Sequence, residues 1–207
     1  MKVYEYGNSD ASTILVQAVE KHSLAGLEAQ TETIRSMTEK DFMLLAICVE
    51  DWNRDLSPWE AEPVFGKEGF GGQAPRLLHE ILSVCRDESK TYYIGGYSLA
   101  GLFALWASYQ TDVFDGVAAV SPSVWFPGFG EFMKKGRPGC EAVYLSLGNR
   151  EEKTKNPVMA TVGDCIREGQ ALLTEQGIDV TLEWNEGNHF RDTDIRTAKG
   201  FAWLLNR

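Results

Sequence analysis

Segments rich in apolar and β-branched residues alternate along this chain with segments in which apolar residues recur at helical spacing. The strand-like segments are residues 13–19, 42–49, 91–95, 117–121 and 142–147. Helical spacing marks residues 24–37, 75–85, 158–173 and 195–205. Near-continuous apolar strands joined through helices are typical of a parallel sheet covered on both faces. We therefore predict a three-layer α/β fold with a mostly parallel central sheet and helices on both faces.

Two further segments fit strands at the margins of this sheet. Residues 178–184 alternate strictly between apolar and polar, which indicates a strand near the sheet edge with one face in water. Residues 2–6 carry a weaker signal of the same kind. The length of 207 residues suits a single domain spanning 1–207.

Charge and hydropathy exclude several classes of protein. A formal net charge of −10 would repel phosphate backbones, so we expect no nucleic-acid partner. The longest apolar run, residues 42–49, has eight residues, whereas a membrane-spanning helix needs about 20. The first residues lack the apolar stretch of a signal peptide. The four cysteines form no C-x-x-C pair, so we interpret them as free thiols in a reducing cytoplasm and expect no structural metal site.

A serine lies at the most informative turn of the chain. The strand-like segment 91–95 leads into Gly96-Tyr97-Ser98, and an apolar helix-like run follows at 102–107. Only small residues stand at positions 96, 100 and 101, as a sharp strand-to-helix turn requires. Such a turn exposes the Ser98 hydroxyl and directs the first helix amides, chiefly that of Leu99, toward an oxyanion. The alternative, a phosphate-binding turn, lacks both the G-x-G-x-x-G spacing and the lysine of a P-loop.

A serine nucleophile needs a base, and the chain contains three histidines. Helical spacing places His79 away from the apolar stripe of its helix, on the surface. His22 directly precedes the first predicted helix, where a surface role or a part in shaping the pocket fits. His189 lies in the loop between the last alternating strand and the last helix. Ligands of open α/β sheets bind at the carboxyl ends of the strands, so this loop can bring His189 to Ser98.

The base must in turn be oriented by an acceptor, usually a carboxylate. Glu151 is the first carboxylate after the strand-like segment 142–147, and the adjacent Glu152 remains an alternative. The other candidates either precede their strand or open the last helix as caps: Asp112, Asp115, Asp192 and Asp194. The chain order Ser98, Glu151, His189 is that of α/β-hydrolases.

With these residues in place, the sequence resembles esterases of the α/β-hydrolase superfamily, the group that includes esterase D-like enzymes and enterobactin esterases. The resemblance covers most of the chain after about residue 40. It is carried by residues 95–104, 114–125, 148–151 and 187–189, and the Ser-Pro-Ser-x-Trp stretch at 121–125 makes it more specific.

The resemblance implies serine-dependent ester hydrolysis without a metal or organic cofactor. Ser98 would be the nucleophile, His189 the base and Glu151 the acid. No His-Gly-Gly stretch follows the first buried strand, so the second oxyanion donor is assigned to the amide of Val19, with Ala18 as the alternative. Compared with fuller proteins of this group, we expect a fold of minimal size, without their N-terminal strands or a large lid domain.

An aromatic cleft over Ser98 is predicted from two long connections. Residues 50–72 are long for a strand-to-helix connection and contain Trp52 and Trp59, and Trp125 follows the Ser-Pro-Ser turn. We predict that Trp52 and Trp125 bind substrate, while a role in sealing the core edge fits each of the three tryptophans, Trp59 included, equally well. An aromatic cleft favours a small acyl or aryl ester, and the acidic surface discourages polyanions.

The predicted function is therefore a cytoplasmic carboxylic-ester hydrolase that is a monomer or small homo-oligomer and acts on a small-molecule ester. The same machinery would also serve a thioesterase, siderophore esterase, deacetylase or peptidase. A non-catalytic hydrolase-like binding protein is the alternative from another class.

Overall fold

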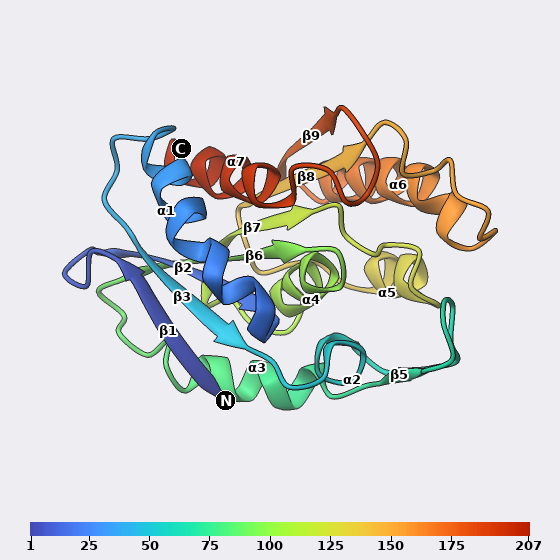
Figure 1. Ribbon diagram of the computed structural model, residues 1–207, viewed down its shortest axis with the longest axis horizontal. Helices are drawn as coiled ribbons and strands as arrows, with labels where there is room; N and C mark the ends of the chain where they lie inside the picture. Colours follow the sequence, from blue (N-terminus) through green and yellow to red (C-terminus); the bar gives the residue numbers. More distant parts are fainter.

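The computed structural model describes residues 1–207 and contains a central sheet of seven strands (Figure 1). The strands are β1 (Lys2–Gly7), β2 (Thr13–Val19), β3 (Met43–Cys48), β6 (Thr91–Tyr97), β7 (Phe114–Val120), β8 (Ala142–Gly148) and β9 (Asp179–Asn185). Their order across the sheet is β1-β3-β2-β6-β7-β8-β9. Only β1 runs antiparallel to its neighbour, and all other neighbouring pairs are parallel. The predicted mostly parallel sheet is confirmed.

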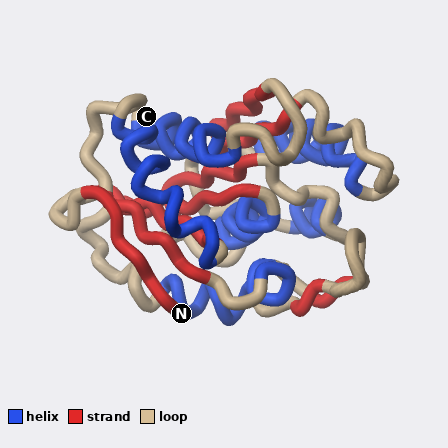
Figure 2. Tube along the Cα trace, viewed as in Figure 1, coloured by secondary structure: helices blue, strands red, loops and turns tan.

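Seven helices surround the sheet (Figure 2). They are α1 (Leu27–Arg35), α2 (Trp52–Leu56), α3 (Ala74–Leu82), α4 (Leu99–Ser108), α5 (Phe129–Lys135), α6 (Val162–Glu175) and α7 (Thr193–Leu205). Helices α1 and α7 pack side by side over one face, and α3, α4 and α6 cover the other (Figure 1). The three predicted layers are therefore present.

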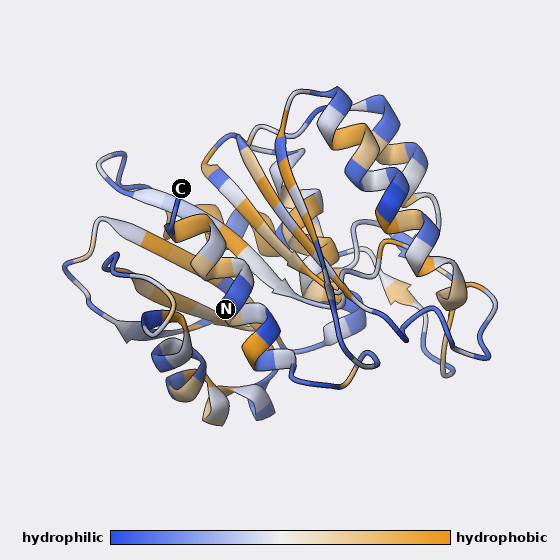
Figure 3. Cartoon of the chain, turned by 90° about the horizontal axis from the view of Figure 1, so that it is seen from above, coloured by the Kyte–Doolittle hydropathy of each residue, from blue (hydrophilic) through white to orange (hydrophobic).

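Successive side chains of β2 point to opposite faces of the sheet, so this strand contributes to the buried clusters on both faces. Leu15 and Val19 belong to the buried cluster that contains Phe201 of α7. Val16 points the other way, into the cluster that contains Leu102 of α4. Every residue of α4 is buried, in agreement with its apolar sequence. In Figure 3 the strands at the centre of the molecule are mostly orange, whereas the peripheral loops are mostly blue or white.

The sheet ends where the alternating patterns predict, with β1 at one edge and β9 at the other. The short elements were not predicted: α2, α5 and a two-stranded ribbon of β4 (Glu60–Ala61) and β5 (Phe70–Gly71). Helix α6 also starts later than its apolar spacing indicates, because Met159–Thr161 form a 3-10 turn first. No helix has both the length and the apolar character needed to cross a membrane. All four cysteines are free.

Candidate active site

Ser98 occupies the single residue between the end of β6 and the start of α4. Its backbone angles, φ 60° and ψ −120°, lie in a region that a residue with a side chain rarely adopts. Such a conformation costs about 1–3 kcal/mol and persists only where the surroundings impose it. The amide of Ser98 donates to the Val120 carbonyl at 3.0 Å, and the Ser98 carbonyl accepts from the Leu102 amide at 3.0 Å. The turn is therefore held between β7 and the first turn of α4.

The small residues around Ser98 are required by close packing. A Cβ placed on Gly96 would lie 2.6 Å from the Cβ of Ala100. A Cβ on Gly101 would lie 2.9 Å from the carbonyl oxygen of Gly96 and 3.1 Å from that of Val120. Strand, turn and helix approach so closely that larger side chains at these two positions would force them apart.

Three side chains from three loops meet at the carboxyl ends of the strands. Nε2 of His189, in the loop after β9, lies 3.0 Å from Oγ of Ser98. Nδ1 of His189 lies 2.7 Å from Oε2 of Glu151, which follows β8. With Nδ1–H donating to the carboxylate, Nε2 is free to accept the Ser98 proton. The structure thus brings together Ser98, Glu151 and His189, which the sequence analysis selected as nucleophile, acid and base.

Glu151 is almost fully buried and is held on both oxygens. Its Oε1 accepts hydrogen bonds from the amide of Gly148 at 2.7 Å, the hydroxyl of Ser121 at 2.7 Å and the guanidinium of Arg196 at 2.8 Å. Burial alone raises the pKa of the Glu151 carboxyl. The hydrogen bond and charge of His189, followed by the hydrogen bonds of Arg196 and Ser121, outweigh burial and lower this pKa to about 2. Glu151 is therefore ionised at neutral pH.

The other residues weighed for these roles lie elsewhere. Glu152 points toward Arg167 at 3.5 Å and does not contact His189. His79 is exposed on α3. His22 lies 3.5 Å from Glu20, and its side chain is 78% exposed. His22 nevertheless lines a pocket that reaches Ser98, which matches its alternative role in shaping the site.

Of the two predicted oxyanion donors, Leu99 directly follows Ser98 in the chain, and Val19 lines a pocket that contains Ser98. Leu99 is the first residue of α4, so its amide has no hydrogen-bond acceptor within the helix. Val19 ends β2, and with Ala18 it lines the pocket that contains Ser98 and His189. Leu99 and Val19 line two different pockets, and Ser98 belongs to the walls of both.

An apolar pocket of about 400 Å³ opens at Ser98 and contains both predicted substrate-binding tryptophans, Trp52 and Trp125. Its other apolar walls are Phe65, Leu99, Met159, Val162 and Phe190. Trp59 is different: its indole N–H donates to the Pro127 carbonyl at 3.0 Å, and its ring packs against Phe126 and Phe132. Trp59 therefore packs at the edge of the core and does not line the pocket at Ser98.

Several residues of the site were not identified from the sequence. Arg196 and Tyr97 contact the groups around Glu151 and His189, and Phe190 is the exposed neighbour of His189. Ser123 places its Oγ 3.4 Å from that of Ser98. Ser121 and Ser123 belong to the Ser-Pro-Ser stretch, so their position after a buried strand was an available signal. Nothing in the local pattern distinguishes Arg196 from a surface arginine.

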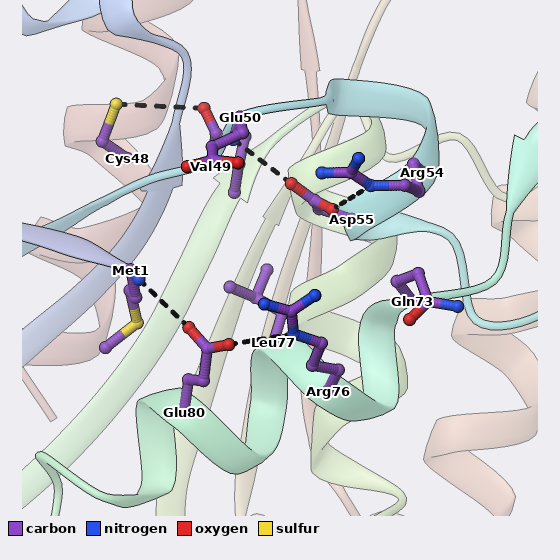
Figure 4. Close-up of a pocket in the computed structure, with 10 residues that line it drawn as sticks. All are labelled: Met1, Cys48, Val49, Glu50, Arg54, Asp55, Gln73, Arg76, Leu77 and Glu80. Carbon is purple, nitrogen blue, oxygen red and sulfur yellow. Dashed lines mark hydrogen bonds and ion pairs between the residues drawn. The ribbon is translucent and has the colours of Figure 1, made fainter.

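A separate pocket between β3, α2 and α3 offers no comparable chemistry (Figure 4). Its volume is about 70 Å³, too small for most organic substrates. Glu80 turns toward both the amino group of Met1, at 3.3 Å, and Arg76, at 3.1 Å, while Arg54 pairs with Asp55. The amino group of Met1 and the side chains of Glu80, Arg76, Arg54 and Asp55 are thus paired with one another. No cluster of His, Cys, Asp or Glu side chains is arranged to hold a metal ion.

Comparison with known proteins places this geometry in a known architecture. The sequence matches no family model and no curated protein. An IroE-like serine hydrolase from Shewanella oneidensis is structurally similar, with a TM-score of 0.76, 16% identity, and coverage of 99% of this chain and 75% of that one. The chain has the α/β-hydrolase fold.

Two other solved structures share this fold. The enterobactin esterase FES from Shigella flexneri, solved with 2,3-di-hydroxy-N-benzoyl-glycine, gives a TM-score of 0.67 and 16% identity over 99% of this chain. This chain spans 55% of the length of that esterase. Esterase PE8 gives a TM-score of 0.63 and 14% identity, with 99% of this chain and 96% of that chain covered. At these identities the likeness concerns the fold, and the chemistry follows from the side chains at the site.

Proposed function

We propose that this protein is a serine-dependent carboxylic-ester hydrolase that acts through an acyl-enzyme on a small acyl or aryl ester. One observation carries the proposal: the hydrogen-bonded series Ser98, His189 and Glu151, with links of 3.0 and 2.7 Å, opens into an apolar pocket. Similarity in fold to proteins named as esterases and a serine hydrolase supports it.

In the first half of the reaction, Oγ of Ser98 attacks the ester carbonyl carbon while Nε2 of His189 takes the hydroxyl proton. The carbonyl oxygen becomes an oxyanion, which the amide of Leu99 and a second amide, that of Val19 or Ala18, stabilise. The intermediate collapses, the C–O bond to the alcohol breaks, and His189 returns the proton to the departing alcohol. The acyl group is left as an ester on Ser98.

In the second half, His189 takes a proton from a water molecule, whose oxygen attacks the acyl carbon. Collapse of this second intermediate breaks the bond to Oγ, returns the proton to Ser98 and releases the carboxylic acid. Glu151 stays ionised throughout, keeps the imidazole oriented with Nδ1–H toward Oε2, and stabilises the imidazolium.

The substrate class is inferred from the pocket walls. The side chains of Trp52, Phe65 and Trp125 line the pocket with aromatic surfaces, and Met159 and Val162 add aliphatic ones. No Lys or Arg lines this pocket, so it offers no permanently charged partner for a carboxylate or phosphate on the substrate. An uncharged aryl or short acyl group fits these walls.

The deciding experiment compares wild type, Ser98→Ala and Ser83→Ala. Ser83 is an exposed serine at the end of α3 and serves as the matched control. Wild type and Ser83→Ala should hydrolyse p-nitrophenyl acetate and gain one fluorophosphonate adduct by intact mass, whereas Ser98→Ala should do neither. Unchanged turnover by Ser98→Ala would refute the assignment, and absent labelling of wild type would favour a binding protein.

A substrate panel separates the related activities. Thioesters, peptides, acetylated sugars, siderophore esters and aryl esters such as p-nitrophenyl benzoate share the same acyl-transfer chemistry. The aromatic walls predict the highest kcat/KM for the aryl esters, and a preference for peptides would overturn this choice of substrate class.

A further inference from the structure

Arg196, in the first turn of α7, is a cation placed in the interior of the protein. Its side chain is 2% exposed, and it is among the largest fully buried side chains of the chain. Burying a guanidinium is costly unless it is paired and hydrogen-bonded. Its Nη atoms have four acceptors, whereas its Nε has no hydrogen-bond partner. The contacts of the two Nη atoms therefore fix its position.

Those contacts reach the loops that carry the three reacting groups. Nη2 donates to Oε1 of Glu151 at 2.8 Å and to the hydroxyl of Ser121. Nη1 donates to the hydroxyl of Tyr97, the residue before Ser98, at 2.8 Å. Nη1 also lies 3.4 Å from the carbonyl of Asn188, the residue before His189. One side chain thus bridges the segments that hold the nucleophile, the acid and the base.

Tyr97 extends this bridge to His189 itself. Its hydroxyl accepts from Arg196 and donates to the backbone carbonyl of His189 at 2.7 Å. Burial raises the pKa of Tyr97 to about 12, so the hydroxyl keeps the proton that it donates. The ring of Tyr97 also lies 5.2 Å from the imidazole of His189, between ring centroids. The loop that carries the imidazole is therefore fastened to the turn that carries Ser98.

The two oxygens of Glu151 are used for different partners. Arg196, Ser121 and the amide of Gly148 all bind Oε1, which leaves Oε2 to His189 alone. Rotation of the carboxylate about its last side-chain bond, other than the half-turn that exchanges its two equivalent oxygens, would take the acceptor away from Arg196 and Ser121. A positive guanidinium also opposes formation of the imidazolium nearby, so its contribution to the reaction is one of orientation and not of charge stabilisation.

We propose that Arg196 is a positioning residue: it holds the Glu151 carboxylate with Oε2 facing His189 and, through Tyr97, ties the histidine loop to the Ser98 turn. This inference rests on the proposed function, because it assigns Arg196 a role in the reaction of Ser98. Arg196 touches neither Ser98 nor the pocket, and it acts through Glu151 and Tyr97.

The test measures kcat and KM on p-nitrophenyl acetate for Arg196→Gln and Arg196→Lys. Loss of a supporting partner of a catalytic group lowers activity by about 10- to 100-fold. We expect a loss of this size in kcat for Arg196→Gln, with KM changed less than about twofold because no pocket wall is altered. Arg196→Lys should recover part of kcat, since an ammonium can still reach Oε1 but lacks the fork that also reaches Tyr97.

A matched control separates positioning from general loss of stability. Lys199 lies on the same helix and pairs with Glu183 at 2.6 Å, away from Glu151. Lys199→Met also removes a cation from an ion pair of α7, so thermal unfolding of both variants is compared. We expect wild-type kcat for Lys199→Met at temperatures where both variants are folded.

A double variant identifies the route of the effect. If Arg196 acts through Glu151 and Tyr97, then adding Arg196→Gln to the double variant Glu151→Gln/Tyr97→Phe should cause no further loss of kcat. A further loss as large as that of Arg196→Gln alone, or a folded Arg196→Gln with kcat within about threefold of wild type, would overturn the proposal.

Two further measurements keep the outcome decisive. If the Arg196 variants do not fold, Tyr97→Phe removes only the bridging hydroxyl; a lowered kcat supports the bridge, and an unchanged kcat overturns it. Ser98→Ala is assayed in parallel. If Ser98→Ala is inactive while Arg196→Gln is fully active, only the positioning role fails, whereas an active Ser98→Ala means that the proposed function itself fails.

Discussion

Glu151 and Glu152 are consecutive in the sequence, yet their side chains lie in opposite surroundings. The side chain of Glu151 is 4% exposed and bonds His189, whereas that of Glu152 is 38% exposed and faces Arg167. A carboxylate orients an imidazole only when it is within hydrogen-bonding distance of it. The two residues therefore form a natural pair of test and control.

Replacing Glu151 by Gln should lower kcat on p-nitrophenyl acetate by about 10²–10⁴-fold, because an amide cannot stabilise the imidazolium and favours the wrong tautomer. Glu152→Gln should keep nearly full activity. Steady-state kinetics of both variants check this expectation. A large loss confined to Glu152→Gln would mean that the other carboxylate is the acid.

Acid unfolding should reveal the buried carboxylate of Glu151. Its pKa in the folded protein, about 2, lies below the ordinary value of 4.5. The unfolded state therefore binds the proton more tightly, and the stability that Glu151 contributes above pH 4.5 is lost as the pH falls toward 2. Urea unfolding between about pH 5 and pH 3 should show a smaller decline in the free energy of unfolding for Glu151→Gln than for wild type. Equal slopes would argue against the lowered pKa.

The packing around Ser98 predicts that Gly96 tolerates no side chain. A Cβ there would lie 2.6 Å from Ala100 Cβ and 2.9 Å from the Ala100 carbonyl carbon, so Gly96→Ala should destabilise the protein by about 1–3 kcal/mol and displace Ser98. Gly130, in α5, has no atom within 4 Å of its Cβ position and provides the control. Gly130→Ala should leave stability unchanged or raise it by up to about 1 kcal/mol through helix propensity. Denaturant unfolding and kcat are measured for both, and an unimpaired Gly96→Ala would contradict the packing argument.

Phe190 should select for apolar substrates. It is 85% exposed, yet its ring lines the pocket beside His189. Burial of part of this ring by a substrate contributes about 1 kcal/mol, so Phe190→Ala should raise KM for p-nitrophenyl benzoate about fivefold and change kcat little. Ile195 is 47% exposed and lies outside the pocket, and Ile195→Ala should behave as wild type. Equal KM values for Phe190→Ala and wild type would exclude this contact.

The interior of the sheet could be predicted from the sequence because its inner strands, β2, β3, β6, β7 and β8, are short and largely buried runs with a strong apolar signal. The edge strands β1 and β9 are mostly exposed or half-buried, and only alternation or a weak signal indicated them. The predicted segment 13–19 coincides with β2, and 142–147 falls one residue short of β8. The elements that were missed, α2, α5 and the β4–β5 ribbon, have between two and seven residues. Elements of that length contain too few residues for a period to show, and tertiary contacts decide their form.

The last helix shows where periodicity misleads. The apolar spacing places Ile195 on its buried stripe, but Ile195 is 47% exposed, while the neighbouring Arg196 is 2% exposed. The helix is rotated so that Arg196 reaches the carboxylate of Glu151. Hydropathy predicts that an arginine lies on the surface. Burial of Arg196 depends on Glu151, a partner far away along the chain, which no local pattern reveals. Ser98 and His189, in contrast, follow from a turn signal and from the small number of histidines.

Apart from Phe190, the aromatic walls of the apolar pocket come from other segments than Ser98, Glu151 and His189. Ser98, Glu151 and His189 follow β6, β8 and β9, whereas Trp52 and Phe65 follow β3, and Trp125 follows β7. Substitutions or insertions in the connections after β3 and β7 can therefore redraw the contour of the cavity while the proton-transfer distances stay as they are. Part of the pocket contour can thus change without altering the proposed reacting groups, which makes the connections after β3 and β7 suitable regions to vary in directed evolution toward new esters.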